Sequence, residues 1–543
     1  MSIKIRSYRG PEQRLGHIKL ITPILSLPFC VHRFTINLLS MEPLVSAVVS
    51  DLLSRALSMV IHKYRQPRGA EQKLQLLQRV LLRIGAMVEE AEGRHITNQA
   101  MLQQLEMLRQ HMYEGHYMLD SFRYRGHGGD DEVSGGRRPA TMSRLRSARH
   151  LLFLSSPRRN TENQQNTELD AESVKSLEKM LAGLETMVGD MEEFTVFLVG
   201  YPRIYRQPYN AYLVLDKVMF GRQMEKERII NFLLQPSAPT SDQNHGVLPI
   251  IGPTRVGKST LVEHVCLDER VRRHFASIVL FTGDDLGAGN LAALSSSGVV
   301  KHQDLTAPSY GRSLAIIELS GDMDEETWGS LYTSAANNMR HGSKIIITSP
   351  SDKIAALGTT HALKLKLLTQ EAYWYFFKVL AFGTISPNDQ RKLASMGMEI
   401  AVLLNGSFLG AHIVGSLMSA NLNAQFWYEV LQGMRDYKSK HLIMFGEHPN
   451  DLIYKDRRVY LWRTTRSEHV VEVSKVYQER SSGQDVPKIT AQDVLSGQVT
   501  HQGKFTILGW RSNIPPYHTY LASCTSQTIG SVDSKKRPRQ ERG

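Results

Sequence analysis

The chain has 543 residues and a mass of 61.3 kDa, which is too long for one hydrophobic core and predicts about three domains. Hydrophobic residues make up 41% and charged residues 22%, proportions that exclude a largely disordered or membrane-embedded protein. The formal net charge of +12 permits contact with an anionic polymer or surface but does not by itself indicate one.

The cysteines and the N-terminal segment limit the class of protein further. Cys30, Cys266 and Cys524 lie far apart, and this odd number without metal-ligand spacing excludes a disulfide framework and favours a reducing compartment. The apolar stretch 18–39 is interrupted by two prolines, a histidine and an arginine, so no transmembrane span is predicted. Residues 1–40 are interpreted as a disordered N-terminal extension.

Residues 41–198 are predicted to form a helical, coiled-coil domain, because apolar residues recur every three or four positions along three stretches. The three stripes are Leu74, Leu77, Leu81, Ile84, Val88 and Ala91; Leu102, Leu105, Leu108, Met112, Leu119 and Phe122; and Val174, Leu177, Leu181, Leu184, Val188, Met191 and Phe194. We expect the first two helices to pair antiparallel. A turn-rich and then basic, Ser-rich run at about 126–165 is predicted to be a linker.

From residue 212 the pattern changes to short apolar runs that alternate with longer helical stretches. The runs at 247–251, 278–281, 314–317 and 344–348 are predicted strands, and 371–382 and 393–417 are predicted helices. Alternating strands and helices indicate a parallel sheet covered on both faces. We therefore expect one domain over 212–437, with a helical subdomain after about residue 368. The region 438–543 shows only mixed short strands and turns and ends in a basic tail; no repeat is found.

The strongest motif in the chain is a complete phosphate loop, G-x-x-x-x-G-K-[ST], which follows the first predicted strand and opens a helix. Its expected nucleotide contacts come from Gly252, Thr254, Arg255, Val256, Gly257, Lys258, Ser259 and Thr260. Backbone N–H groups and the helix N-terminus would face the phosphates, and Lys258 would bridge the β and γ phosphates. The Ser259 hydroxyl would bind Mg²⁺. The fold class expected is therefore a helical bundle followed by a P-loop NTPase α/β sheet with a helical subdomain.

The residues needed for hydrolysis are incomplete. The strand 314–317 ends in Glu318-Leu319, so Glu318 is a degraded Walker B carboxylate and a candidate Mg²⁺ ligand beside Ser259. The acidic residues at 322–326 are interpreted as a solvated loop. Ser349-Pro350 stands where many signalling NTPases carry an arginine that senses the γ-phosphate. These losses weaken transition-state stabilisation more than ground-state binding, so we expect an ATP- or ADP-binding protein that hydrolyses ATP slowly or not at all.

The order of several motifs resembles that of plant NB-ARC proteins. The segments concerned are FGRQME at 220–225, VRRHF at 271–275, GSKIIIT at 342–348, LTQEAYWYFF at 368–377 and NGSFLG at 405–410. In the last segment, Phe408 replaces the proline of the family's GLPLA motif. Residues 107–125 resemble the helix that carries the EDVID segment, retaining Tyr113, Leu119, Asp120 and Phe122, with His116-Tyr117 in place of the acidic pair.

The chain thus resembles a coiled-coil NB-ARC disease-resistance protein without leucine-rich repeats, over residues 41–437. The likeness stops before the winged-helix domain, and no MHD motif is found. It implies an intracellular immune switch that is ADP-bound at rest and ATP-bound when active. Its helical N-terminal domain would self-associate or bind partner NLR or other helical proteins. A cytoplasmic location is implied.

Two alternatives remain open at this point. In the first, the NB-ARC fold is degenerate and the protein acts as an interaction or decoy protein through its helical bundle. In the second, the protein is nuclear and associated with nucleic acid, as the basic tail at 535–539 and the Arg-rich linker indicate. No recognition helix or base-reading motif is present, so nucleic acid is not an expected partner.

Overall fold

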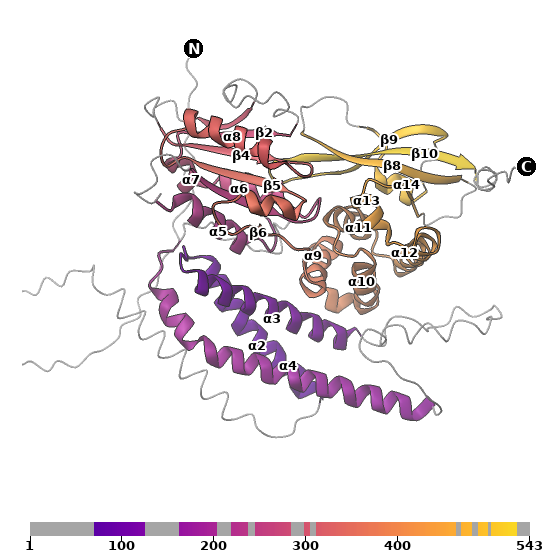
Figure 1. The fold of residues 1–543 in the computed structure, drawn as a ribbon. Helices are drawn as coiled ribbons and strands as arrows, with labels where there is room; N and C mark the ends of the chain where they lie inside the picture. Colours follow the sequence, from indigo (N-terminus) through magenta and orange to yellow (C-terminus); the bar gives the residue numbers. More distant parts are fainter. Residues whose placement is uncertain are drawn as a thin grey trace, which may run out of the picture. The chain divides into compact units, whose positions relative to one another are not determined.

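The structure, a computed structural model, describes residues 70–124, 162–203, 219–236, 245–283, 298–303, 311–462, 469–480, 487–497 and 501–528 (Figure 1). All of these residues belong to one unit, Ser54–Gly543. The expectations for residues 1–40, for the linker up to residue 161 and for the basic tail lie outside the described residues. Among the described helices, none is both long and apolar enough to cross a bilayer.

Three helices of the N-terminal bundle lie within the described residues: α2 (Ala70–Glu92), α3 (Gln99–Arg123) and α4 (Glu162–Val199). The predicted apolar stripes meet in one core, in which Leu77, Leu108 and Leu184 are completely buried. Arg109 in the middle of α3 lies 3.7 Å from Glu92 at the end of α2. Further along α3, Arg123 donates to Gln78 near the start of α2. These two contacts show that α2 and α3 run antiparallel, as predicted.

A six-stranded sheet follows the bundle, with the strand order β3-β2-β4-β5-β1-β6. Its strands are β1 (Gly246–Ile251), β2 (Ser277–Thr282), β3 (Val299–Gln303), β4 (Ser313–Glu318), β5 (Lys344–Ser349) and β6 (Leu363–Lys364). All adjacent strands are parallel except β3, which runs antiparallel to β2. This sheet confirms the predicted parallel α/β class, although the short edge strands β3 and β6 were not predicted.

Both faces of the sheet are covered because nearly every central strand residue is apolar. The helices α5 (Gln223–Leu234), α6 (Lys258–Cys266) and α7 (Glu269–His274) share one core with residues such as Ile250 and Ile316. On the opposite face, α8 (Glu325–Asn338) and η5 (Asp352–Leu357) pack on the alternate residues, including Ile251 and Ile317. The period of two along each strand therefore assigns each residue to one layer.

The helices after the sheet correct one prediction. The stretch 393–417 is not one helix but two, α10 (Arg391–Leu403) and α11 (Phe408–Ala420). In the segment that separates the two helices, Asn405 and Gly406 have left-handed φ values of 46° and 76°. A left-handed backbone conformation ends a helix. These helices and α9 (Gln370–Phe382) share a core that includes the buried side chains of Trp374 and Trp427.

The C-terminal region contains a second sheet that the sequence did not indicate. After α12 (Ala424–Phe445) and α13 (Pro449–Tyr454) come β7 (Val459–Tyr460), β8 (His469–Arg480), α14 (Ala491–Leu495), β9 (Gly503–Arg511) and β10 (His518–Thr528). The strands are antiparallel in the order β7-β8-β10-β9. Their buried residues, such as Val471, Ile507 and Ala522, form a separate core.

Candidate nucleotide-binding site

The phosphate loop lies at the carboxyl edge of the parallel strands, between β1 and α6. Ile251 at the end of β1 is aligned with Ser349 at the end of β5, and Thr348 is aligned with Glu318 at the end of β4. The loop, Glu318 and Ser349 therefore lie at the same edge of the sheet. Open α/β sheets bind their ligands at this edge.

Two glycines permit the path of the loop. Gly252 has a φ of 151°, and a Cβ there would lie 2.3 Å from the carbonyl oxygen of Leu365, so no larger residue fits. Its N–H donates to the Ser349 carbonyl over 3.3 Å. Gly257 has a φ of 95°, and a Cβ there would meet no neighbouring atom within 4 Å, so open space lies beside it. Val256, buried in the sheet core, anchors the loop between the two glycines.

Lys258 begins α6, and its ammonium group donates to the carbonyls of Gly252 and Pro253 at 2.6 and 2.8 Å. Burial lowers its pKa to about 8, although the charge of Glu318 acts in the opposite direction. A desolvated ammonium held mainly by neutral carbonyls gains strongly from an anionic acceptor. Ser259 and Thr260 follow in the first turn of α6, where backbone N–H groups lack partners within the helix. These features fit a bound phosphate group.

The strand ends hold the residues that matter for hydrolysis. Glu318 is the half-buried last residue of β4, whereas the N–H of Leu319 donates to the Thr348 carbonyl over 2.8 Å. At the end of β5, Ser349 takes the place of the arginine that senses the γ-phosphate in many signalling NTPases. Its hydroxyl donates a hydrogen bond to the carbonyl of Gly321. In the described part of the chain, no group of three or more His, Cys, Asp or Glu side chains is arranged to hold a metal ion. A Mg²⁺ ion bound with a nucleotide needs fewer protein ligands, because phosphate oxygens and water complete its shell.

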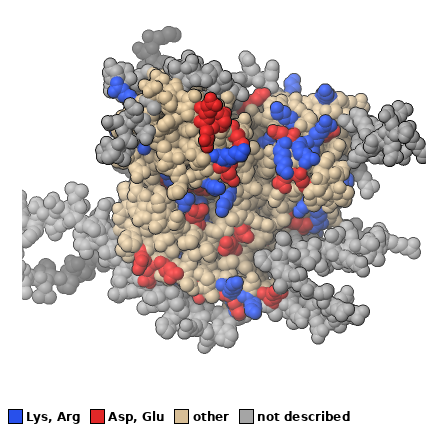
Figure 2. Space-filling view, viewed as in Figure 1, with Lys and Arg blue, Asp and Glu red and all other residues tan. Residues whose placement is uncertain are grey.

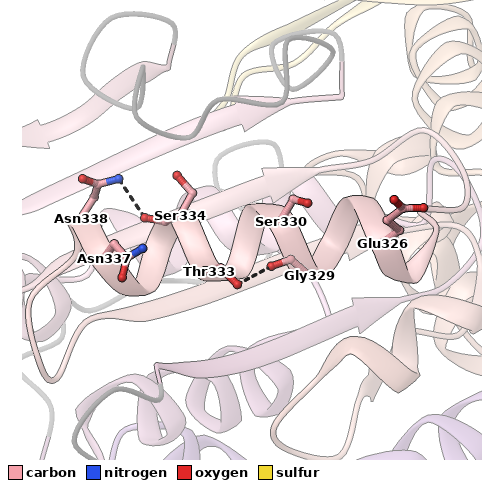
Figure 3. A pocket seen from close by; sticks show the side chains of 7 residues that line it. All are labelled: Glu326, Gly329, Ser330, Thr333, Ser334, Asn337 and Asn338. Atoms are coloured by element: carbon pink, nitrogen blue, oxygen red, sulfur yellow. Dashed lines mark hydrogen bonds between the residues drawn. The ribbon is translucent and has the colours of Figure 1, made fainter.

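The acidic segment 322–326 is a loop only up to Asp324, because Glu325 and Glu326 lie in the first turn of α8. Asp324 caps α8 by accepting the Thr327 N–H at 2.7 Å, and exposed Asp322 pairs with Lys353. A hollow of about 610 Å³ runs along α8 and is lined by Glu326, Gly329, Ser330, Thr333, Ser334, Asn337 and Asn338 (Figure 3). Thr333 and Asn338 bond to carbonyls of their own helix, and no residue of the phosphate loop lines the hollow.

The side chains of Thr254 and Arg255 contact the C-terminal region, which the sequence did not predict. Thr254 donates to the Tyr454 carbonyl at 3.4 Å, and Arg255 donates to the carbonyls of Ile453 and Val476 at 3.0 and 2.6 Å. The partners are about 200 residues apart in the sequence, so no local sequence pattern could predict these contacts.

The segment 405–410 differs from the family motif in its packing. Ser407 caps α11 through the Gly410 N–H, and its carbonyl accepts the Tyr373 hydroxyl at 2.7 Å. The ring of Phe408 packs edge-on against Phe376, with centroids 5.3 Å apart. Phe408 is therefore part of the helical core.

The helix that resembles the EDVID segment makes a polar contact with α9. Asp120, which is only 4% exposed, accepts hydrogen bonds from Trp374 Nε1 at 2.9 Å and Lys378 Nζ at 2.6 Å. His116 is neutral at physiological pH, because burial and the charge of Lys378 lower its pKa to about 4. The sequence singled out Asp120 by resemblance but gave no partner for it.

The charges of the described residues on the face drawn in Figure 2 give little support to nucleic-acid binding. On the face drawn in Figure 2, basic and acidic side chains lie interspersed rather than gathered by sign. Several basic residues are paired, as Lys455 and Arg457 are with Glu447. This face offers no broad basic patch.

A parallel sheet with a phosphate loop at its carboxyl edge, preceded by a helical bundle, defines a P-loop NTPase fold. Residues 48–152 match the Rx N-terminal domain family. The chain is 23% identical over 387 residues to disease resistance protein RGA2 of Solanum bulbocastanum, covering 67% of this chain and 36% of that protein. It is 24% identical over 378 residues to disease resistance RPP13-like protein 1 of Arabidopsis thaliana, covering 66% and 34%. These similarities support a protein of the coiled-coil NB-ARC (NLR) type.

The matched region spans about a third of the length of these relatives. Among solved structures, a chain of Drosophila ORC bound to DNA aligns with a TM-score of 0.22 and 12% identity, over 45% of this chain and 77% of that chain. A likeness this slight carries no inference about this protein.

Proposed function

We propose that this chain is a nucleotide-dependent switch in plant immune signalling that binds ADP or ATP with Mg²⁺ in the loop 252–260. The observation that carries the proposal is Lys258, a desolvated ammonium at the start of a helix, bonded to two loop carbonyls. Such a group gains more from a phosphate than from neutral acceptors. The similarity to disease resistance proteins supports the biological role.

Each domain has its own proposed role. Residues 212–437 would form the nucleotide-binding domain, with Gly252, Gly257 and the first turn of α6 surrounding the phosphates. Ser259 and Glu318 would hold Mg²⁺. Residues 41–198 would form the coiled-coil domain, which self-associates or binds partner NLR or other helical proteins. The cytoplasm would be its place of action.

Hydrolysis is proposed to be slow or absent. The residue after Glu318 is Leu319, so a second carboxylate is missing there. The Leu319 side chain packs with the apolar side chains on one face of the sheet. No arginine follows β5, where Ser349 bonds to Gly321. Both absences remove charge stabilisation from the transition state while leaving the phosphate loop complete.

Calorimetric titration of the full chain with ADP and with Mg-ATP tests the proposal. We expect micromolar binding, a range typical of ground-state recognition (about −8 kcal/mol at 1 μM), and its loss in Lys258→Ala. Lys353→Ala is the matched control, since that lysine is exposed and pairs with Asp322 on the surface. Equal binding by wild type and folded Lys258→Ala would refute the assigned site.

One observation favours a second candidate, an interaction protein with a degenerate loop. The polar side chains of Thr254 and Arg255 are already engaged by the C-terminal region. If folded wild-type protein binds neither ADP nor Mg-ATP, this second function replaces the first, and the helical bundle becomes the functional centre.

A further inference from the structure

Two basic residues lie at the amino edge of the parallel sheet, the edge opposite to the phosphate loop. Lys344 is the first residue of β5, and Arg312 directly precedes β4. The strand register aligns Lys344 with Leu314, which belongs to the core shared with α5 and α7. Because side chains two residues apart on a strand share a face, Arg312 lies on the same side of the sheet as Leu314. The length of β5 places Lys344 about 17 Å from Ser349 at the carboxyl edge.

The ammonium group of Lys344 is buried without an anionic partner. The residue is only 6% exposed, and no residue that the structure describes accepts a hydrogen bond from the ammonium or forms an ion pair with it. The ammonium lies 5.2 Å from the centre of the Phe232 ring on α5, a weaker attraction than that of an anion. Burial and then the charge of Arg312 lower the pKa of Lys344. A cation desolvated in this way is strongly stabilised by an anion.

Arg312 adds a second cation beside the first. Its Nη1 atom lies 3.1 Å from Nε2 and 3.4 Å from Nδ1 of His274, the last residue of α7. Burial and then the charges of Arg312 and Lys344 lower the pKa of His274, so both cations lie near one imidazole. Arg273, the preceding residue of α7, pairs with Glu269. Among the described ion pairs, by contrast, none includes Arg312 or Lys344, and their charges are left for another partner.

Two glycines leave the room that these cations occupy. A Cβ at Gly246 would lie 3.0 Å from Cδ and 3.1 Å from Nζ of Lys344. Gly342 has a φ of 84°, and a Cβ there would lie 2.9 Å from Nε of Arg312. A larger residue at either position would have to displace the charged group. The backbone of the sheet edge therefore packs closely against both cations.

We propose that Lys344 and Arg312 form a second anion site, which binds a small molecule that carries a phosphate group. The ammonium and the planar guanidinium both donate charge-assisted hydrogen bonds, and phosphate oxygens accept from both. Because Lys344 is recessed, a small ligand reaches it, whereas the backbone of a nucleic-acid duplex does not. The site and the phosphate loop lie at opposite edges of the sheet, so each binds an anion without the other.

Calorimetric titration of the full chain with inorganic phosphate and with glucose 6-phosphate tests the site. All variants carry Lys258→Ala, so that the phosphate loop does not contribute. We expect this parent to bind at least one of the two ligands, and Lys344→Met to weaken that binding by at least about tenfold, the effect of one charge-assisted hydrogen bond. Arg312→Gln should also weaken it. Arg273→Gln is the matched control, because that arginine is exposed and pairs with Glu269; it should bind like the parent.

Thermal unfolding of the same variants gives a second readout. A ligand that binds only the folded state raises the midpoint, so phosphate should raise that of the parent and not that of Lys344→Met. No binding of either ligand to the parent at millimolar concentration, or unchanged affinity in both Lys344→Met and Arg312→Gln, would overturn the inference. Binding of glucose 6-phosphate alone would assign an organic phosphate, and binding of inorganic phosphate alone the free anion. If wild type binds no ADP while the parent still binds phosphate, the nucleotide proposal fails and this site stands.

Discussion

Two properties of Lys258 oppose each other, its need for a positive charge and its burial. Its ammonium must remain charged to attract a phosphate, yet burial lowers its pKa to about 8. The carbonyls of Gly252 and Pro253 and the nearby charge of Glu318 keep the charged form accessible. The lysine is charged below pH 8 and increasingly neutral above it.

We therefore predict that nucleotide affinity is constant below pH 8 and falls as the pH rises above 8, by up to about tenfold per pH unit. The reason is that the bound phosphate requires the ammonium, which must then be protonated at the expense of binding energy. Titrations with ADP at pH 7 and pH 9 measure the effect. Lys258→Arg stays charged throughout this range, so its pH dependence should disappear; a drop of the same size in that variant would contradict the assignment.

At the scale of elements, a buried carboxylate on α3 is one of several polar contacts between the bundle and α9. Asp120 on α3 accepts from both Trp374 and Lys378 on α9. The Lys378 ammonium also lies 5.7 Å from the centre of the Trp374 ring and 5.3 Å from that of Tyr375. Aromatic rings of Tyr113 and Phe220 pack around the same contact. The carboxylate of Asp120 thus links the bundle to α9 among surrounding aromatic side chains.

Asp120→Ala should lower the free energy of unfolding by about 3 kcal/mol, because it leaves a buried ammonium and a buried indole N–H without their acceptor. Asp120→Asn should cost less, since an amide oxygen still accepts the indole N–H. Urea unfolding measures both. Asp190→Ala on the exposed face of α4 is the control, and an Asp120→Ala protein as stable as that control would mean that the contact contributes nothing.

Across the whole molecule, α9 and α11 connect the bundle to the C-terminal sheet. Phe376 on α9 packs against His412 on α11, and the His412 ring stacks on Trp510 of β9, with centroids 3.8 Å apart and planes 8° from parallel. A second link runs from α12 to β7, where His441 Nε2 accepts the Tyr460 N–H at 3.0 Å. Burial lowers the pKa of His412 to about 4. His441 must be neutral to accept this hydrogen bond, and burial favours the neutral form of His412.

Mild acid should accordingly loosen the C-terminal sheet. A histidine whose folded pKa lies near 4 contributes stability that is fully present above its unfolded pKa of about 6.5 and is lost as the pH falls towards 4. The free energy of unfolding should fall by about 1.4 kcal/mol per pH unit for each such histidine. His412→Phe keeps the stacking but cannot be protonated, so urea unfolding at pH 7 and pH 5 should show a smaller loss than in wild type. An equal loss would exclude His412 as a source.

Much of the fold could be predicted because its signals are local. Leu77, Leu81 and Ile84 repeat with the period of a helix, and alternation with strands such as 247–251 and 344–348 indicates a parallel sheet. The phosphate loop was predicted for the same reason, since its glycines and Lys258 lie close together in the sequence. The helix expected over 393–417 was wrong at Asn405-Gly406, because the apolar pattern continues through a break that left-handed backbone imposes.

By itself, the sequence determined the class of fold, the position of the phosphate loop and the likeness to coiled-coil NB-ARC proteins. Only the tertiary structure decided what the polar side chains contact. Asp120 and Lys378 are 258 residues apart, and Arg255 and Val476 are 221 apart. Neither pair belongs to a repeating pattern, because a hydrogen bond between distant segments depends on how whole elements dock. The second sheet was hidden for a related reason: its strands are stabilised by pairing across the sheet, and its half-buried residues follow no strict alternation.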